Sequence, residues 1–134
     1  MPSTYHLPRT LLRRLQRESH KADIHELCYL LFGRGARISK MIKIPNRADD
    51  TVLKHVIMSR DVERVRSLAS VRHLSQLGYL HTHPVSQARP SQADVKGYAP
   101  GTLIFIYADC FRDLRAFRIR IDGRRFVEKM IELH

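Results

Sequence analysis

The sequence predicts a single α/β domain, residues 1–134, in which helices flank a curved mixed β-sheet. Three observations lead to this prediction. The N-terminal segment is amphipathic with a helical period, several short apolar or alternating segments are bounded by turn residues, and segments of the two kinds alternate along the chain. A chain of this length can bury one hydrophobic core without disulfides or a second subunit.

The N-terminal part of the chain predicts a helix and then a hairpin. From Leu7 to about Lys21, leucines recur on one face and arginines elsewhere, which is the period of an amphipathic helix, and Pro8 suits its first turn. Glu26–Phe32 predicts the first strand. The Gly-Arg-Gly stretch at 33–35 predicts a turn into a second strand over Arg37–Ile44.

The next part of the chain predicts an exposed connection followed by a helix. Residues 45–51 are polar and rich in turn formers, and a short apolar segment, His55–Met58, comes after them. A helix is then expected to begin at Ser59 or Asp61 and to run to about Ser75, because apolar residues recur there at helical spacing.

The second half of the chain predicts short elements separated by turn residues. In order, these are a strand ending at His83, a short helix over Ser91–Tyr98, a central strand over Thr102–Ala108 and an alternating strand over Leu114–Ile121. Asp122-Gly123 predicts a two-residue hairpin turn. The last element, Arg124–Leu133, is either a strand or a helix, because its period does not distinguish the two.

Composition limits the class of protein. An apolar fraction of 43% and no apolar run of membrane-spanning length indicate a globular chain that uses no membrane. The N-terminus lacks the cationic start and apolar core of a signal peptide, so we expect a cytoplasmic protein. Cys28 and Cys110 lie in or beside predicted strands, and we expect two buried free thiols rather than a disulfide or a second metal site.

The formal net charge of +11 favours an anionic partner such as nucleic acid, a membrane surface or an acidic protein. The basic residues are spread along the whole chain, and no aromatic-studded RNA-binding motif accompanies them. A solvated basic surface and a working basic patch therefore both remain open.

The stretch His81-Thr82-His83-Pro84 is the strongest chemical signal in the chain. On a strand, His81 and His83 project from the same face, where two neutral imidazoles suit zinc better than magnesium or calcium. Asp94 supplies a third ligand, because Ser91 is expected at the N-cap of the next helix and Asp94 at its third position. Three protein ligands leave one coordination position open, which is typical of a catalytic zinc site and predicts a hydrolase.

Each part of this pattern also has a purely structural interpretation. A His-x-His pair is commonly hydrogen-bonded without metal, and Ser-x-x-Asp resembles an ordinary capping box. Glu26, taken alone, would be interpreted as a surface carboxylate. The conjunction of these residues at this spacing is what favours the metal site.

These residues resemble the JAMM, or MPN-plus, metalloproteases. The family signature is an upstream glutamate, His-Ser/Thr-His-Pro, and then Ser-x-x-Asp, and the chain matches it at His81-Thr82-His83-Pro84 and Ser91-x-x-Asp94. Glu26 opens the segment that matches the family's glutamate strand, with Tyr29 in place of the usual glycine. The resemblance runs from Glu26 to about Ala108 and implies a JAMM/MPN fold, a cytidine-deaminase-like sandwich.

The resemblance implies a mechanism and a class of substrate. Zn2+ would be held by His81, His83 and Asp94, Glu26 would act as general base and acid, and Ser91 would stabilise the oxyanion. Glu18 is the nearest replacement for Glu26 as base. Such proteins cut the peptide or isopeptide bond after the C-terminal Gly-Gly of a ubiquitin-like or sulfur-carrier protein.

A partner's tail is expected to lie against an edge strand within Asn46–Met58, with Arg47 and Lys54 steering an acidic partner. The alternative function is a nucleic-acid-binding module on a JAMM-like zinc fold, similar to RadC, as the charge suggests. An intact Glu26, His81, His83, Ser91 and Asp94 favours the enzyme, and nucleic acid binding is then expected to be nonspecific. Oligomeric state and any activating subunit stay open.

Overall fold

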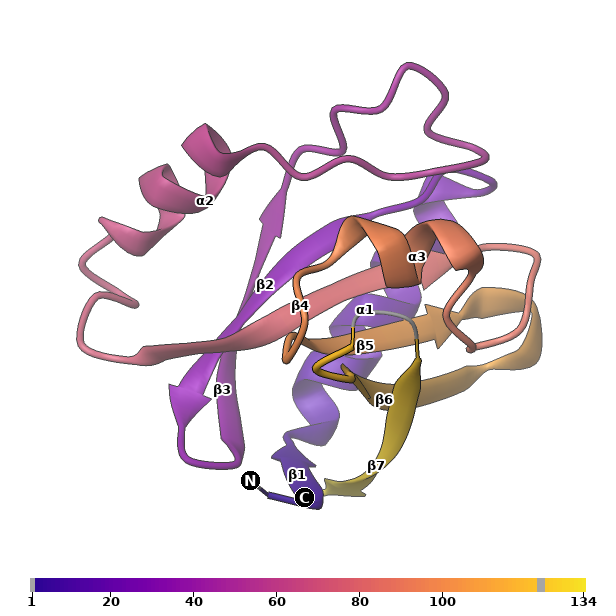
Figure 1. Cartoon of the computed structure of the whole chain (residues 1–134). Coiled ribbons are helices and arrows are strands. Elements are labelled where there is room, and N and C mark those ends of the chain that lie inside the picture. Colours follow the sequence, from indigo (N-terminus) through magenta and orange to yellow (C-terminus); the bar gives the residue numbers. More distant parts are fainter. Residues whose placement is uncertain (1, 123–124) are drawn as a thin grey trace.

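A mixed β-sheet that closes on itself forms the framework of the molecule. The computed structural model describes residues 2–122 and 125–134 (Figure 1). The strands among these residues are β1 (Thr4–Leu7), β2 (Cys28–Arg34), β3 (Arg37–Ile44), β4 (Ser75–His83), β5 (Leu103–Ala108), β6 (Asp113–Ile119) and β7 (Phe126–Leu133). Their order in the sheet is β1-β3-β2-β4-β5-β6-β7, and β7 pairs with β1 to complete the circle. Three pairs are parallel, β4 with β5 and β1 with both β3 and β7.

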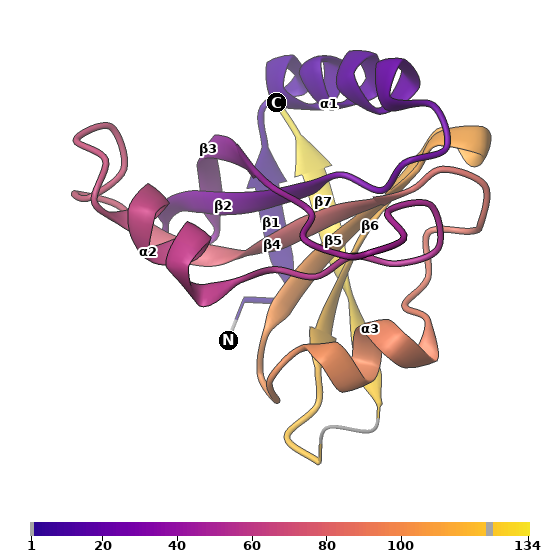
Figure 2. The ribbon, with the colours of Figure 1, turned by 90° about the horizontal axis from the view of Figure 1, so that it is seen from above.

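Three α-helices cover this sheet in the part of the chain that is described. They are α1 (Arg9–Ala22), α2 (Ser59–Arg66) and α3 (Gln92–Gly97), and a short 3-10 turn, η1, spans Asp109–Phe111. Figure 2 shows α1 on one side of the sheet and α2 and α3 toward the other. No helix within the described ranges has the length and apolarity needed to cross a membrane.

The two faces of the central strands build two sides of the core. Every residue of β5 is buried, which confirms the prediction of a central strand covered on both faces. Leu103, Phe105 and Tyr107 face the cluster that includes Leu15 of α1. Their neighbours Ile104, Ile106 and Ala108 join a cluster on the opposite face. The expected α/β class and mixed sheet are confirmed. The sheet differs from the expected curved layer in that it closes on itself.

Strand β1 causes this closure and was absent from the prediction. Tyr5 and Leu7 are buried and alternate with the less buried Thr4 and His6, a strand pattern only four residues long. Leu7, expected in the helix, instead ends β1, because Pro8 is the N-cap and has extended backbone angles. The first helix therefore starts later than expected.

The prediction for residues 55–75 needs two corrections. His55–Met58 forms no strand, and α2 ends at Arg66 although the helix was expected to reach Ser75, which instead begins β4. The Ser67 hydroxyl donates to the Arg64 carbonyl at 2.7 Å, so a serine side chain competes with the helical backbone bonds at this end.

The first hairpin turns later than predicted, at Gly35 and Ala36. Gly33 lies inside β2 at a register shift, where a Cβ atom would come within 1.9 Å of the Arg37 carbonyl oxygen. Glycine is therefore needed at position 33 for close backbone approach, whereas Gly35 has the positive φ of the turn.

Several C-terminal details also differ from expectation. Ile121, which the predicted alternation places on one face with Phe117 and Ile119, is 90% exposed, because β6 ends two residues earlier at Ile119. The element left open between strand and helix is the strand β7. The predicted turn at Asp122-Gly123 falls partly outside the described residues. Both cysteines are free, but Cys110 is exposed and only Cys28 is buried.

Candidate metal centre

Three side chains from the end of β4 and the start of α3 meet at one point. His81 and His83 project from the same face of β4, and Asp94 follows eleven residues after His83 in the first turn of α3. The Nε2 atoms of the two histidines lie 3.2 Å apart, and Asp94 Oδ2 lies 3.2 Å from His81 Nε2 and 3.1 Å from His83 Nε2. The structure thus brings together the three predicted ligands.

The chemistry of these atoms fits a metal ion. Ligand atoms about 2.0–2.1 Å from a tetrahedral zinc ion lie about 3.3 Å from one another, close to this triangle. The Nδ1 of His83 lies 2.8 Å from the Gln87 carbonyl oxygen, so Nδ1 carries the hydrogen and Nε2 of the neutral ring presents a lone pair. Lone pairs that converge this closely repel one another unless a cation or a proton lies between them.

Burial and mutual contacts shift the pKa values of all three groups. Burial lowers the pKa of His81 to about 4, and nearby His55 adds to this effect. Burial alone would lower the pKa of His83 as well, but its hydrogen bonds to Asp94 and Gln87 outweigh burial and raise the pKa. For Asp94 burial raises the pKa, and hydrogen bonds with the two histidines more than reverse this, so the carboxylate stays ionised.

Ser91 fixes the Asp94 carboxylate through a capping box, as the sequence predicts. The Ser91 amide donates to Asp94 Oδ2 at 2.9 Å, and the Asp94 amide donates to Ser91 Oγ at 3.0 Å. Ser91 is exposed at the pocket, and its hydroxyl hydrogen is not used in either bond. It can therefore be donated to a ligand.

Glu26 lies beside the histidines, two residues before β2 begins. Its amide donates to the Thr51 carbonyl at 2.7 Å, and its own carbonyl accepts from Asn46 Nδ2 at 3.1 Å. Ligand-type atoms of Glu26, His81 and His83 lie within 4.8 Å of one another. Glu26 is therefore held by its backbone, with its carboxylate toward the two histidines. Glu18, the alternative base, bonds with Tyr29 and Arg14 instead.

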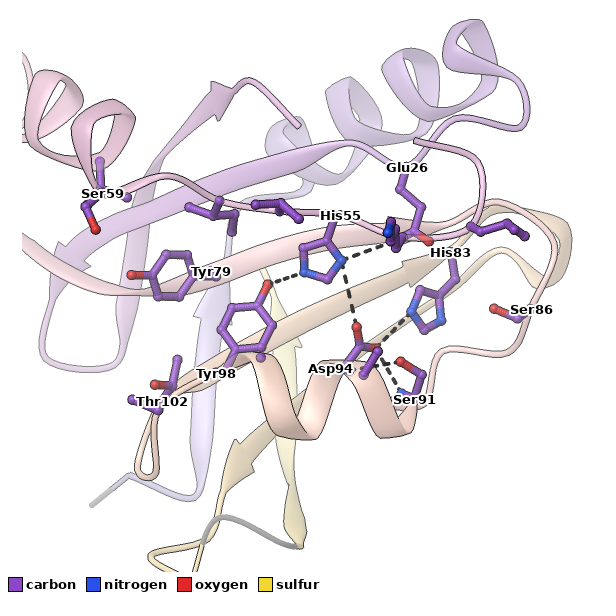
Figure 3. Close-up of a pocket in the computed structure, with 18 of the residues that line it drawn as sticks. Glu26, His55, Ser59, Tyr79, His83, Ser86, Ser91, Asp94, Tyr98 and Thr102 are labelled. Carbon is purple, nitrogen blue, oxygen red and sulfur yellow. Dashed lines mark hydrogen bonds and ion pairs between the residues drawn. The ribbon is translucent and has the colours of Figure 1, made fainter. Parts of the chain in front are cut away.

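Two further residues belong to this centre and were missed by sequence reasoning. His55 Nδ1 lies 3.2 Å from Glu26 Oε1 and 3.8 Å from Asp94 Oδ1, and its Nε2 lies 2.7 Å from the Tyr98 hydroxyl (Figure 3). Tyr98 carried a usable signal, because it follows Asp94 by four residues within the predicted helix Ser91–Tyr98, a spacing that places two residues on one helix face. His55 stands in an irregular loop and carried none.

The residues behind the centre support it without offering further ligands. The Thr82 hydroxyl accepts from the Leu27 amide at 2.9 Å, so this side chain points away from the histidines, as alternation along a strand requires. Cys28 pairs with His81 across the sheet. Burial, with Glu26 and Asp94 nearby, raises the pKa of the Cys28 thiol to about 12.

A pocket of about 600 Å³ opens onto these residues. Figure 3 shows its side chains coming from the irregular segment before α2 on one side and from α3 on the other. Apolar and aromatic residues outside the centre also line it: Leu53, Val56, Ile57, Val62 and Tyr79. The arrangement thus has three converging donor groups that suit a metal ion, a further carboxylate beside them and a pocket in front.

Comparison with solved structures shows that this fold is shared. A protein from Desulfitobacterium hafniense, solved in solution, has a TM-score of 0.80 and 24% identity over 97% of this chain and 92% of that one. A JAB1/MPN domain protein from Archaeoglobus fulgidus has a TM-score of 0.63 and 17% identity over 97% and 99%. A structure described as a JAMM metalloprotease-like zinc site in the proteasome and signalosome has a TM-score of 0.59 and 16% identity over 98% and 99%.

The family follows from a sequence comparison. No curated protein matches the chain. A model of the prokaryotic homologs of the JAB domain matches residues 8–120, which extends the resemblance beyond the Glu26 to Ala108 range of the motifs on both sides. The chain therefore belongs to the prokaryotic homologs of the JAB domain.

Proposed function

We propose that this protein is a zinc-dependent metallopeptidase that hydrolyses the peptide or isopeptide bond after the C-terminal Gly-Gly of a ubiquitin-like or sulfur-carrier protein. The observation that supports this most directly is the convergence of His81, His83 and Asp94 within 3.2 Å, with Glu26 beside them and a pocket in front. An arrangement built only for stability has no need of the open pocket.

The two histidines and the aspartate would hold the ion. His81 and His83 offer Nε2, and Asp94 offers a carboxylate oxygen already fixed by the Ser91 amide. Zinc supplies Lewis acidity, which polarises a carbonyl and makes a water molecule more acidic. Zinc is preferred to magnesium or calcium because two of the three ligands are imidazoles.

Glu26 would act as general base and then as general acid. Its carboxylate takes a proton from the attacking water and passes it to the leaving amine, which peptide hydrolysis requires. Ser91 would donate its free hydroxyl hydrogen to the developing oxyanion, an interaction worth about 3 kcal/mol in other hydrolases. Both residues line the pocket, so both can reach a bound substrate.

The pocket also supports a substrate with a slender end. A tail that reaches the centre would lie in the pocket that His55–Ile57 and residues of α3 line, and the aromatic and branched side chains there favour a tail without bulky side chains. The expected edge strand is not formed at His55–Met58, and the Val56 amide already donates to Asn46 Oδ1. Arg47 forms two hydrogen bonds with Asp61, whose charge offsets its own, and steering by Arg47 and Lys54 stays a prediction.

Metal analysis combined with cleavage assays tests the proposal. The wild type should bind about one zinc ion per chain and cleave a fusion carrying a Gly-Gly tail. His81→Ala and Asp94→Ala should lose zinc and activity together, whereas Glu26→Gln should keep zinc and lose most turnover. Full zinc occupancy in His81→Ala and Asp94→Ala would refute the ligand assignment.

Substrate class has its own test. A fusion ending in Ala-Ala should not be cleaved, because each added methyl group widens the part of the tail that must lie beside Glu26. Equal cleavage of the Gly-Gly and Ala-Ala fusions would point to a different peptide or a small amide as substrate.

A further inference from the structure

His55 occupies a central place between the proposed base and the proposed ligands. Its ring stacks on His81 with centroids 4.1 Å apart and planes inclined by 22°, and its side chain is only 9% exposed. Of its two nitrogens, Nδ1 faces Glu26 and Nε2 faces Tyr98. Every polar atom of this imidazole thus has a defined partner.

The partners determine where the hydrogens lie. An ionised Glu26 can only accept, so His55 Nδ1 carries a hydrogen and donates it to Oε1 at 3.2 Å. Nε2 of the neutral ring then accepts, and the Tyr98 hydroxyl donates to it at 2.7 Å. If His81 offers Nε2 to a metal, its Nδ1 carries a hydrogen, and the Tyr98 oxygen accepts it at 3.4 Å.

The result is a directed chain of hydrogen bonds from His81 through Tyr98 and His55 to Glu26. Hydrogen-bond partners of this kind fix the tautomer and orientation of the side chains they contact. Within the described residues, Glu26 Oε1 is tied to His55 and no hydrogen bond to Oε2 is found. Oε2 is therefore the oxygen that is free to take a proton.

The loop that carries His55 is itself fixed. Asn46 donates to the carbonyls of Glu26 and Lys54 at 3.1 and 3.0 Å, and its oxygen accepts from the Val56 amide at 3.0 Å. One side chain thus links the backbones on both sides of His55 to the backbone of Glu26. The spacing between the imidazole and the carboxylate is set by this linkage.

We propose that His55 is a positioning residue that holds the Glu26 carboxylate in its reactive orientation, in the Nδ1–H tautomer that Tyr98 selects. This inference rests on the proposed function of Glu26 as base. His55 does not take the transferred proton. It occupies Oε1 so that Oε2 faces the water and the leaving amine.

Substitutions that keep or remove the Nδ1 donor test this role. His55→Asn places an amide N–H near the position of Nδ1, whereas His55→Gln places it near Nε2. We expect kcat for the Gly-Gly fusion to fall about 10- to 100-fold in His55→Gln and His55→Ala. In His55→Asn, most of the wild-type kcat should be kept. KM should change by a similar factor in His55→Gln and His55→Asn, because His55 also lines the pocket and the two side chains are close in size, so the difference in kcat between these two variants is the decisive result. His73→Ala, an exposed histidine outside the pocket, is the control and should change neither.

Zinc content separates positioning from metal binding. His55→Ala should retain about one zinc ion per chain. Loss of zinc from this variant would make His55 a ligand and overturn the inference. Equal kcat values for His55→Gln and His55→Asn would overturn it as well, and this comparison remains valid if His55→Ala does not fold.

The tautomer gives a readout that does not depend on activity. Proton–nitrogen correlation spectra of the zinc-loaded chain with isotope-labelled histidine should show His55 as Nδ1–H, and Tyr98→Phe should convert part of it to Nε2–H. If the wild type cleaves no tail fusion, the proposed function fails, but these spectra still decide whether the hydrogen-bond chain exists. An Nε2–H tautomer in the wild type would overturn the inference.

Discussion

Tyr29 stands where the resemblance expects glycine, and the structure gives this residue a role away from the metal centre. It is fully buried in β2, and its hydroxyl donates to Glu18 Oε1 at 2.6 Å. Glu18 also pairs with Arg14 of its own helix and Lys43 of β3. A large side chain at position 29 thus connects the sheet to α1 through one carboxylate.

Glu18→Gln should destabilise the protein at neutral pH by about 0.5–1 kcal/mol, because the partly exposed ion pairs are lost while the shape is kept. Burial raises the pKa of Glu18, but the bonds to Tyr29 and Arg14 outweigh it and hold the pKa below 4.5. A lowered folded pKa gives stability that is present above pH 4.5 and lost as pH falls through the folded value.

Urea unfolding at several pH values checks this. The difference in the free energy of unfolding between wild type and Glu18→Gln should shrink toward zero as the pH falls from 4.5 through the lowered folded pKa. Glu132→Gln, an exposed carboxylate of β7, is the matched control and should show little difference at neutral pH. A pH-independent difference for Glu18→Gln would show that the charge is not the cause.

Single residues also show what could and could not be predicted from the sequence. His81, His83, Ser91 and Asp94 are close in the chain, and the periods of a strand and a helix place them relative to one another. His55 lies in an irregular loop that is distant along the chain from both the histidine strand and the helix of Asp94. Its position depends on the hydrogen bonds that Asn46 makes. Local spacing carries no information about such a contact.

At the scale of elements, the approach of β4 to β5 depends on Gly78. A Cβ atom at this position would lie 2.4 Å from the Leu103 carbonyl oxygen, which belongs to the backbone of a buried strand and cannot move away easily. Gly78→Ala should therefore cost about 1–3 kcal/mol of stability. Gly97→Ala, where nothing lies within 4 Å, should instead be neutral or stabilise by about 0.4–1 kcal/mol. Thermal unfolding of both variants decides this, and equal effects would contradict the packing argument.

The loop before α2 offers a second test at this scale. Asn46→Ala removes the bonds to Glu26, Lys54, Ala48 and Val56, and should cost about 2–4 kcal/mol of local stability. The amides of Ala48 and Val56 should then exchange about 30-fold faster or more with solvent. Asn46→Asp keeps the accepting oxygen and should keep these two amides protected. Unchanged exchange in Asn46→Ala would show that the loop is held by other contacts.

Element boundaries were predictable where the residues themselves mark them. Ser91 marks the start of α3, and an apolar run marks β5. The predicted bounds of both elements agree with the structure to within one residue. β1 was not, because four residues beside Pro8 are too few for a period, and its partner β7 lies at the other end of the chain. The length of α2 depended on Ser67, whose side chain competes for the helix end.

Viewed as a whole, the molecule separates its acidic centre from part of its basic surface. Glu26 and Asp94 are buried at the centre, whereas Arg9, Arg13 and Arg17 are exposed on α1, on the other side of the sheet. No ion pair to these three arginines is found within the described residues. The net charge of +11 is thus not explained by the proposed active site.

Binding to nucleic acid is therefore expected to be weak, nonspecific and independent of the metal centre. If these three arginines contact phosphates, the affinity of the protein for duplex DNA should fall about 40-fold between about 50 and 200 mM salt. Arg13→Ala combined with Arg17→Ala should reduce the salt dependence by about two phosphate contacts. His81→Ala, which disrupts only the metal centre, should leave DNA binding unchanged. Fluorescence anisotropy with two unrelated duplexes over this salt range measures all three effects. Tight binding to one duplex that survives about 200 mM salt would favour a nucleic-acid-binding module over a peptidase, because phosphate contacts alone cannot distinguish sequences.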